Sequence, residues 1–132
     1  MPLFLQESSL FASALDQMKG KRVVVLGHRR PDGDCVGSQV ALTRVLRAHG
    51  IDARAVNEDP VPRTLRSFVG DTPFLAPADL SGDDFVAVTV DCADHRRVGE
   101  SLCGRFPDVF LNVDHHVSND RYAELNLVLA EA

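Results

Sequence analysis

Carboxylate and imidazole side chains gather in three short stretches of this sequence, residues 28–34 (HRRPDGD), 91–94 (DCAD) and 114–116 (DHH). If these stretches met in space without cations, the acidic groups would repel one another and their pKa values would rise. Divalent cations would offset this repulsion better than the nearby arginines do. They would also explain the imidazoles, which bind metal in the neutral form. The pattern therefore predicts a metal site.

A strand is predicted immediately before each stretch. Residues 22–27 (RVVVLG), 85–90 (FVAVTV) and 109–113 (VFLNV) are short apolar, β-branched runs that are typical of buried strands. In an open parallel sheet, ligands bind beyond the carboxyl ends of the strands. Parallel strands would therefore bring the three stretches to one edge of the sheet.

Helices are predicted between the strands. Apolar residues recur at helical spacing over residues 5–18 and 36–49, where Val40, Val45 and Leu46 share a face and Gly50 follows as the terminating glycine. Shorter elements are expected at 52–56 (a strand), 63–68 (a helical turn) and 95–102 (a helix). This alternation predicts an α/β fold, a mostly parallel sheet with helices on both faces.

The donor types indicate which ion the site would hold. Mixed carboxylate and imidazole donors without thiolate suit manganese, with magnesium, iron or zinc less favoured. Two ions roughly 3.5–4 Å apart are suited to in-line attack on phosphorus. The sequence thus predicts metal-dependent phosphate chemistry.

Single residues also allow structural interpretations. Asp32 or Asp34 could be turn or N-cap residues before the following helix, and Asp91 could end a strand in a turn. Ser38 could cap the first helical turn or bind a phosphate oxygen. Two adjacent histidines after Asp114 are harder to explain by packing, whereas His49 and His95 are expected to face solvent.

Composition narrows the classes of function. The chain has 132 residues, and its net charge of −5 argues against a broad basic surface for long nucleic acid. No apolar run is long enough for a transmembrane helix, and the first ten residues lack the features of a signal peptide. Three cysteines without C-x-x-C spacing argue against a disulfide framework or a structural zinc knuckle and favour the cytoplasm.

The motifs resemble those of a known superfamily. Residues 27–38 (GHRRPDGDCVGS), 90–94 (VDCAD) and 112–119 (NVDHHVSN) are similar to the first three motifs of the DHH phosphoesterases. That superfamily includes RecJ-type exonucleases, oligoribonuclease/phosphoadenosine-phosphate phosphatases (nano-RNases), exopolyphosphatases and family II inorganic pyrophosphatases. The resemblance implies a manganese-dependent hydrolase with two ions, magnesium being the alternative, and a nucleotide or short single-stranded RNA as substrate.

Carried over by position, the resemblance implies five metal ligands. His28 and Asp32 would bind one ion, Asp34 and His115 would bind the other, and Asp91 would bridge the pair.

The resemblance also implies roles for four further residues. Asp114 would orient a ligating histidine, and His116 would act as a hydrogen-bond donor or general acid toward the scissile phosphate. Ser38 and Arg97 are candidate substrate contacts.

The nano-RNase branch fits best, because pyrophosphatases usually carry other residues at the positions of Arg30 and Gly33. Ala123 departs from the glycine that is usual in that branch. A fourth motif, with another aspartate ligand, and a C-terminal DHHA1 domain follow in the superfamily, but this chain stops at Ala132. We therefore expect residues 1–132 to be the N-terminal part of a DHH domain that lacks a C-terminal domain or an oligomer partner, and we expect little or no activity from this chain alone. The alternatives are a non-catalytic metal- or nucleotide-binding module and a pyrophosphate or polyphosphate hydrolase.

Overall fold

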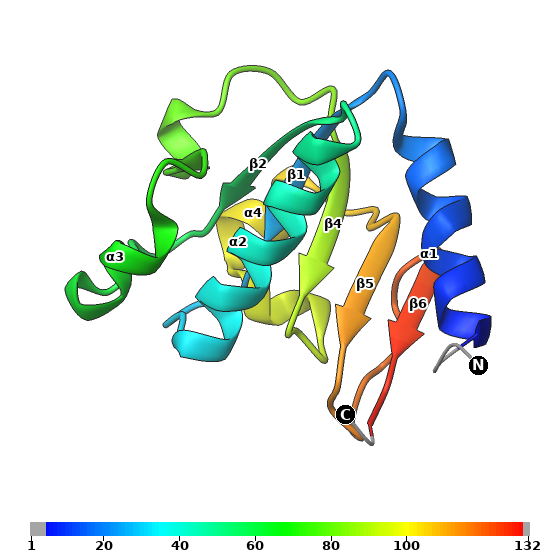
Figure 1. Ribbon diagram of the computed structural model, residues 1–132. Helices are drawn as coiled ribbons and strands as arrows, with labels where there is room; N and C mark the ends of the chain where they lie inside the picture. The colour runs from blue at the N-terminus through cyan, green and yellow to red at the C-terminus, as the bar shows by residue number, and fades with distance from the viewer. Residues whose placement is uncertain (1–4, 131–132) are drawn as a thin grey trace.

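The computed structural model describes residues 5–130 and contains a six-stranded sheet whose paired strands are all parallel (Figure 1). The strand order is β3-β2-β1-β4-β5-β6. The three strands before the acidic stretches therefore lie side by side at its centre. The strands are β1 (Arg22–Leu26), β2 (Asp52–Val56), β3 (Phe74–Leu75), β4 (Val86–Val90), β5 (Leu111–Asp114) and β6 (Leu125–Val128).

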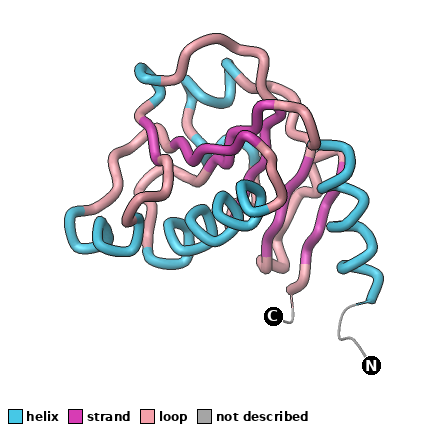
Figure 2. Tube along the Cα trace, turned by 45° about the horizontal axis from the view of Figure 1, so that its top comes forward, coloured by secondary structure: helices cyan, strands magenta, loops and turns pink. Residues whose placement is uncertain are grey.

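Helices cover both faces of the sheet, as predicted, and Figure 2 shows helical segments on both sides of the strands. Among the described residues, no helix is both long and apolar enough to cross a membrane. The α-helices are α1 (Leu5–Met18), α2 (Gly33–Ala48), α3 (Arg66–Val69) and α4 (Glu100–Arg105), and the short 3₁₀ helices are η1 (Arg63–Leu65), η2 (Pro77–Asp79) and η3 (His95–Val98).

The central strands are buried on both faces. Val23 and Val25 of β1 pack with α1 and α2, whereas Val24 and Leu26 pack with residues of η3 and α4. All four side chains have no exposed surface. A strand that is buried on both faces consists of consecutive apolar residues, which is why apolar and polar residues do not alternate along β1.

The second long helix begins earlier than residue 36. Asp32 is its N-cap, and its Oδ1 accepts a hydrogen bond of 2.9 Å from the Cys35 amide, so the helix starts at Gly33. Gly50 has a φ of 77° just after the helix end, as predicted. The prediction that Val45 shares the core face was wrong, because Val45 is 40% exposed.

The helix predicted at 95–102 is divided at Gly99 into η3 and α4. Gly99 has a φ of 113°, and the Glu58 carboxylate occupies the place where a side chain would lie. Glu58 Oε1 accepts a hydrogen bond of 3.1 Å from the Leu102 amide. Because the glycine has no side chain to cap α4, a carboxylate from the loop after β2 does so.

Gly27 directly follows β1 and is closely packed. An added Cβ would lie 2.5 Å from Cys35 Sγ and 2.6 Å from both Asn57 Oδ1 and Gln39 Oε1. These three neighbours are buried and hydrogen-bonded, so they have little room to move. We expect Gly27→Ala to lower the free energy of unfolding by about 1–3 kcal/mol, measured by urea denaturation.

Gly104→Ala is the matched control for this prediction. A Cβ at Gly104, within α4, would meet no atom within 4 Å, so alanine should stabilise the helix slightly. Equal unfolding midpoints for the two variants would show that the space around Gly27 is not restrictive.

Candidate metal centre

Asp91 lies at the centre of the predicted site. It directly follows β4, is 6% exposed, and adopts a φ of 52°, in the left-handed region that few non-glycine residues visit. Its amide donates a hydrogen bond of 3.0 Å to the Val113 carbonyl, which ties this turn to β5. Backbone strain of this kind persists where the surrounding structure enforces it, and it concentrates at functional sites.

His28 approaches Asp91 from the end of β1. Its Nε2 lies 3.6 Å from Asp91 Oδ2 and 3.8 Å from Asp32 Oδ1. Its Nδ1 donates a hydrogen bond of 2.7 Å to the Arg29 carbonyl. In the neutral imidazole this contact places the proton on Nδ1, so the Nε2 lone pair faces two carboxylates. Electron-rich atoms facing one another in this way suit a bound cation, and the donor set fits a divalent metal.

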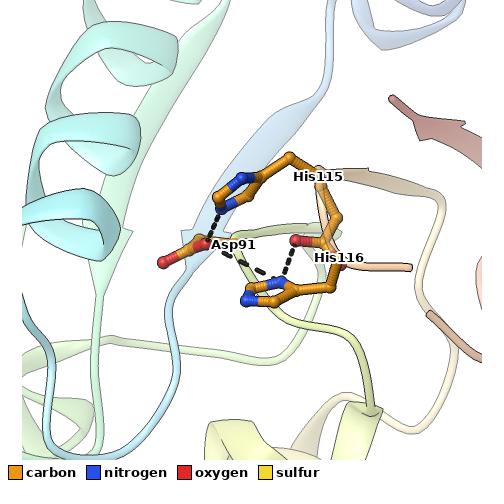
Figure 3. A group of neighbouring side chains, drawn as sticks. Asp91, His115 and His116 are labelled. Atoms are coloured by element: carbon orange, nitrogen blue, oxygen red, sulfur yellow. Dashed lines mark hydrogen bonds and ion pairs between the residues drawn. The ribbon is translucent and has the colours of Figure 1, made fainter. Parts of the chain in front are cut away.

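His115 and His116 approach Asp91 from the end of β5 (Figure 3). His115 Nε2 lies 2.9 Å from Asp91 Oδ1, and His116 Nδ1 lies 3.9 Å from the same oxygen. Asp91 thus belongs to two groups of potential ligands, one with His28 and Asp32 and one with the residues of the DHH stretch. The predicted meeting of the three stretches is present in the structure.

A buried polar network holds the DHH stretch in place. Asp114 Oδ1 accepts a hydrogen bond of 2.6 Å from His116 Nδ1, and its Oδ2 accepts one of 2.7 Å from Asn119 Nδ2. The same Asn119 nitrogen donates to Asn112 Oδ1 at 2.7 Å, and Asn112 Nδ2 in turn donates to Thr89 Oγ1 at 2.9 Å. Sequence reasoning did not assign Asn112, Asn119 or Thr89 to the site. Asn112 and Thr89 are polar residues inside predicted strands, which is a usable signal, whereas Asn119 lies in a loop and gives none.

The remaining predicted site residues lie on α2 and η3. Asp34 and Ser38 are both exposed on α2, and Asp34 belongs to neither group of potential ligands. Ser38 is in the second turn of the helix, so it does not cap the first turn, a role that Asp32 fills. Arg97, on η3, is exposed and lines a cleft beside His28.

The two histidines that were expected to face solvent, His49 and His95, differ in their exposure. His49 is exposed, as predicted. The prediction for His95 was wrong, because its ring is partly buried and stacks on Tyr122 with a centroid separation of 5.4 Å. Its Nδ1 lies 3.6 Å from Cys103 Sγ. The fold of the 117–123 loop over η3 causes this burial, and no local sequence pattern indicates it.

Sequence reasoning also missed a fourth polar stretch at a strand end, Asn57-Glu58-Asp59 after β2. Asn57 Oδ1 accepts a hydrogen bond of 2.9 Å from the Gly27 amide, and Asp59 Oδ2 accepts one of 2.8 Å from the Arg30 amide. The rule that identified the other three stretches would have found this one. Asn57 and Asp59 thus position the loop that carries His28, whereas Glu58 caps α4.

Two thiols close to the site are unsuited to metal binding. Burial raises the pKa of Cys35 to about 12 and that of Cys92 to about 11, so both stay protonated at neutral pH. In native protein treated with EDTA at pH 8, we expect a thiol reagent to modify Cys103, which is partly exposed, and to spare the other two. Mass spectrometry of the labelled protein tests this. Labelling of Cys35 or Cys92 at the rate of the unfolded chain would contradict the buried geometry.

The chain is similar in sequence to one protein family and in fold to a solved structure. The model of the family described as "DHH family, N-terminal domain" matches residues 22–131. An exopolyphosphatase-related protein from Bacteroides fragilis shares the fold, with a TM-score of 0.80 and 16% sequence identity over all of this chain and 42% of that one.

The curated relatives are named either as NrnA, an oligoribonuclease and PAP phosphatase, or as an inorganic pyrophosphatase. A bifunctional oligoribonuclease and PAP phosphatase NrnA of Thermus thermophilus is 32% identical over 96% of this chain and 37% of the relative. A probable manganese-dependent inorganic pyrophosphatase of Streptococcus mutans is 32% identical over 72% of the chain and 31% of the relative. A probable NrnA of that organism is 25% identical over 92% of the chain and 38% of the relative. The chain therefore spans less than two-fifths of the length of these curated relatives.

Proposed function

The chain belongs to the DHH family, and from that premise we propose that it is the metal-binding part of a phosphoesterase that hydrolyses short oligoribonucleotides or phosphoadenosine phosphate. The observation that carries this proposal is the convergence of donors from three strand ends on Asp91. The names of the NrnA relatives support the substrate class.

We propose that the donors around Asp91 hold two Mn²⁺ ions. His28 and Asp32 would hold one ion, His115 would hold the other, and Asp91 would contribute to both. Asp34, which is exposed on α2 and lies outside both groups of potential ligands, would have to complete the ligands of the second ion. The name of the S. mutans pyrophosphatase supports manganese, and the oxygen and nitrogen donor set suits it. Bound there, the ions would polarise the phosphoryl oxygens and neutralise charge that develops in the transition state.

His116 is the residue that we expect to move a proton. Asp114 accepts the hydrogen bond from Nδ1, so Nε2 is the ring nitrogen left to face the substrate. The Asp114 side chain is fully buried and fixed by Asn119, so the orientation of the ring is set before substrate binds. In its doubly protonated form, the ring held in this way can donate from Nε2 a hydrogen bond to the scissile phosphate or a proton to the leaving oxygen, and it then keeps the Nδ1 proton on Asp114.

Pyrophosphate hydrolysis is the second candidate function. The 32% identity to a protein named as a manganese-dependent inorganic pyrophosphatase favours it. The same metal centre would serve both reactions, so substrate contacts outside the centre would distinguish them.

A hydrolysis assay tests these proposals. The whole protein and, separately, residues 1–132 alone are incubated with Mn²⁺ and adenosine 3′,5′-bisphosphate, a diribonucleotide or pyrophosphate, and the release of phosphate or mononucleotide is measured. We expect the whole protein to turn over the first two substrates, to lose turnover with EDTA and to recover it with added Mn²⁺, and we expect little or no turnover by residues 1–132 alone. Faster turnover of pyrophosphate would favour the second candidate. A whole protein that binds Mn²⁺ but hydrolyses none of the three would make the chain a non-catalytic module, against the proposal.

A further inference from the structure

A cleft rich in arginine borders the candidate metal centre. It has a volume of about 590 Å³ and is lined by His28, Arg29, Arg30, Asp59 and Arg97. His28 belongs to both sites, because the residue lines the cleft while its Nε2 lies 3.6 Å from Asp91 Oδ2. Three guanidinium groups around one cleft are a local excess of positive charge in a chain whose net charge is −5.

These arginines lack carboxylate partners among residues 5–130. Arg44, Arg54, Arg96 and Arg105 each form an ion pair there, whereas Arg29, Arg30 and Arg97 form none. The lone carboxylate that lines the cleft, Asp59, uses Oδ2 to accept the hydrogen bond from the Arg30 amide. Guanidinium groups without carboxylate partners are available to bind an anion.

The backbone holds these arginines in fixed positions. Arg30 adopts a φ of 53°, an unfavourable conformation that the hydrogen bond to Asp59 supports. The Arg29 amide donates a hydrogen bond of 2.7 Å to the Arg97 carbonyl and joins the loops after β1 and β4. The three side chains therefore start from one rigid patch of backbone, which lowers the entropic cost of binding an anion.

We propose that Arg29, Arg30 and Arg97 bind a phosphate group of the substrate that is not itself hydrolysed. This inference rests on the proposed function, because the scissile phosphate would lie at Asp91 on the other side of His28. It specifies substrates that carry a second phosphate, such as a nucleoside 3′,5′-bisphosphate or an oligonucleotide.

A neighbouring cleft favours a nucleotide over pyrophosphate as the ligand. It has a volume of about 380 Å³ and shares Asp59 with the arginine cleft. Glu58 and Arg66 also line it, but most of its lining residues are apolar, among them Pro60, Val61, Val69, Phe74 and Leu75. Apolar and aromatic surfaces of this kind suit a nucleobase. A nucleotide whose phosphate sits in the arginine cleft would thus have a place for its base.

Binding measured without metal tests this proposal separately from catalysis. AMP, adenosine and pyrophosphate are titrated into the chain in EDTA, and the changes in NMR chemical shift are followed. We expect the Arg29→Gln/Arg30→Gln double variant to bind AMP about tenfold more weakly, since two charge-assisted contacts are lost. Adenosine binding should not change, and pyrophosphate should bind more weakly than AMP.

Arg63→Gln is the matched control, because Arg63 is exposed on η1 and does not line the cleft. It should bind AMP as the unmodified chain does. Arg97→Gln provides a second test that leaves Arg30 and its strained backbone unaltered. Unchanged AMP affinity in either cleft variant, or no AMP binding by the unmodified chain, would overturn the proposal. Pyrophosphate binding at least as tight as that of AMP would overturn the preference for nucleotides.

Mn²⁺ titration of the same variants separates the two proposals. Both cleft variants should keep the Mn²⁺ affinity of the unmodified chain, because the arginines are not ligands. If the chain does not bind Mn²⁺ but loses AMP binding in the variants, the metal-dependent function fails and the phosphate site stands. If it binds Mn²⁺ and AMP binding is insensitive to the arginines, only the phosphate site fails.

Discussion

Asp91→Asn is expected to weaken Mn²⁺ binding by at least about 100-fold. Loss of residues that only orient ligands typically costs about 10–100-fold in metal affinity, so loss of a direct ligand should cost more. Asp91 is also the one carboxylate common to both groups of potential ligands, so its removal affects both proposed ions. Asparagine tolerates the left-handed conformation at this position, so the variant changes the charge with little change in backbone strain.

Asp94→Asn is the control for the Asp91 variant. Asp94 lies on the same loop but caps η3 through the Arg96 amide and stands outside both groups of potential ligands. Its ion pair with Arg96 lowers the pKa of the Asp94 carboxyl to about 2, so at neutral pH the variant removes the same unit of charge. Isothermal calorimetry should give Mn²⁺ affinities within about twofold for this control and the unmodified chain. Equal losses in the two variants would show that general charge, rather than coordination, attracts the metal.

His116→Gln is expected to lower kcat by about 10²–10⁴-fold while Mn²⁺ affinity stays nearly unchanged. Glutamine keeps a polar side chain of similar length but cannot deliver a proton as an imidazole does. Asp114→Asn should lower kcat in the same direction, because the imidazole then loses the charged hydrogen bond that fixes its orientation.

Phosphate release from adenosine 3′,5′-bisphosphate measures the His116 effect, and His49→Gln is the control. His49 is exposed after α2 and has no contact with the site, so its replacement should leave kcat unchanged. Unaltered turnover in His116→Gln would remove this histidine from the proposed mechanism. A loss of Mn²⁺ affinity equal to the loss in kcat would instead make it a metal ligand.

Much of the fold could be predicted because its strands are buried on both faces. A continuous apolar segment such as Val23–Leu26 predicts a central strand, because such a strand is buried on both faces. Strands that are connected by helices run parallel to one another. Parallel strands share one carboxyl edge, so the meeting of His28, Asp91 and His115 followed from topology alone. No local sequence pattern predicted the two-residue strand β3 or the half-buried strand β6, since their pairing depends on neighbours rather than on their own composition.

The supporting contacts could not be predicted because they join residues far apart in the sequence. Glu58 caps a helix that begins more than forty residues later, and Gly27 is required because side chains from α2 and from the loop after β2 meet above it. For Asp32, the sequence predicted two alternative roles and could not show that one residue is placed for both. It was expected to be either a helix cap or a potential ligand, but the structure places one carboxylate at the helix start and beside His28.

Anomalous diffraction from a crystal of this chain soaked in Mn²⁺ tests the central claim most directly. Data collected on both sides of the manganese absorption edge would locate each ion without reference to activity. The account predicts anomalous density between His28 Nε2 and the Asp91 carboxylate, and a second site where Asp91 meets His115. A fully soaked crystal with no density beside Asp91, or with manganese bound at other residues, would contradict it.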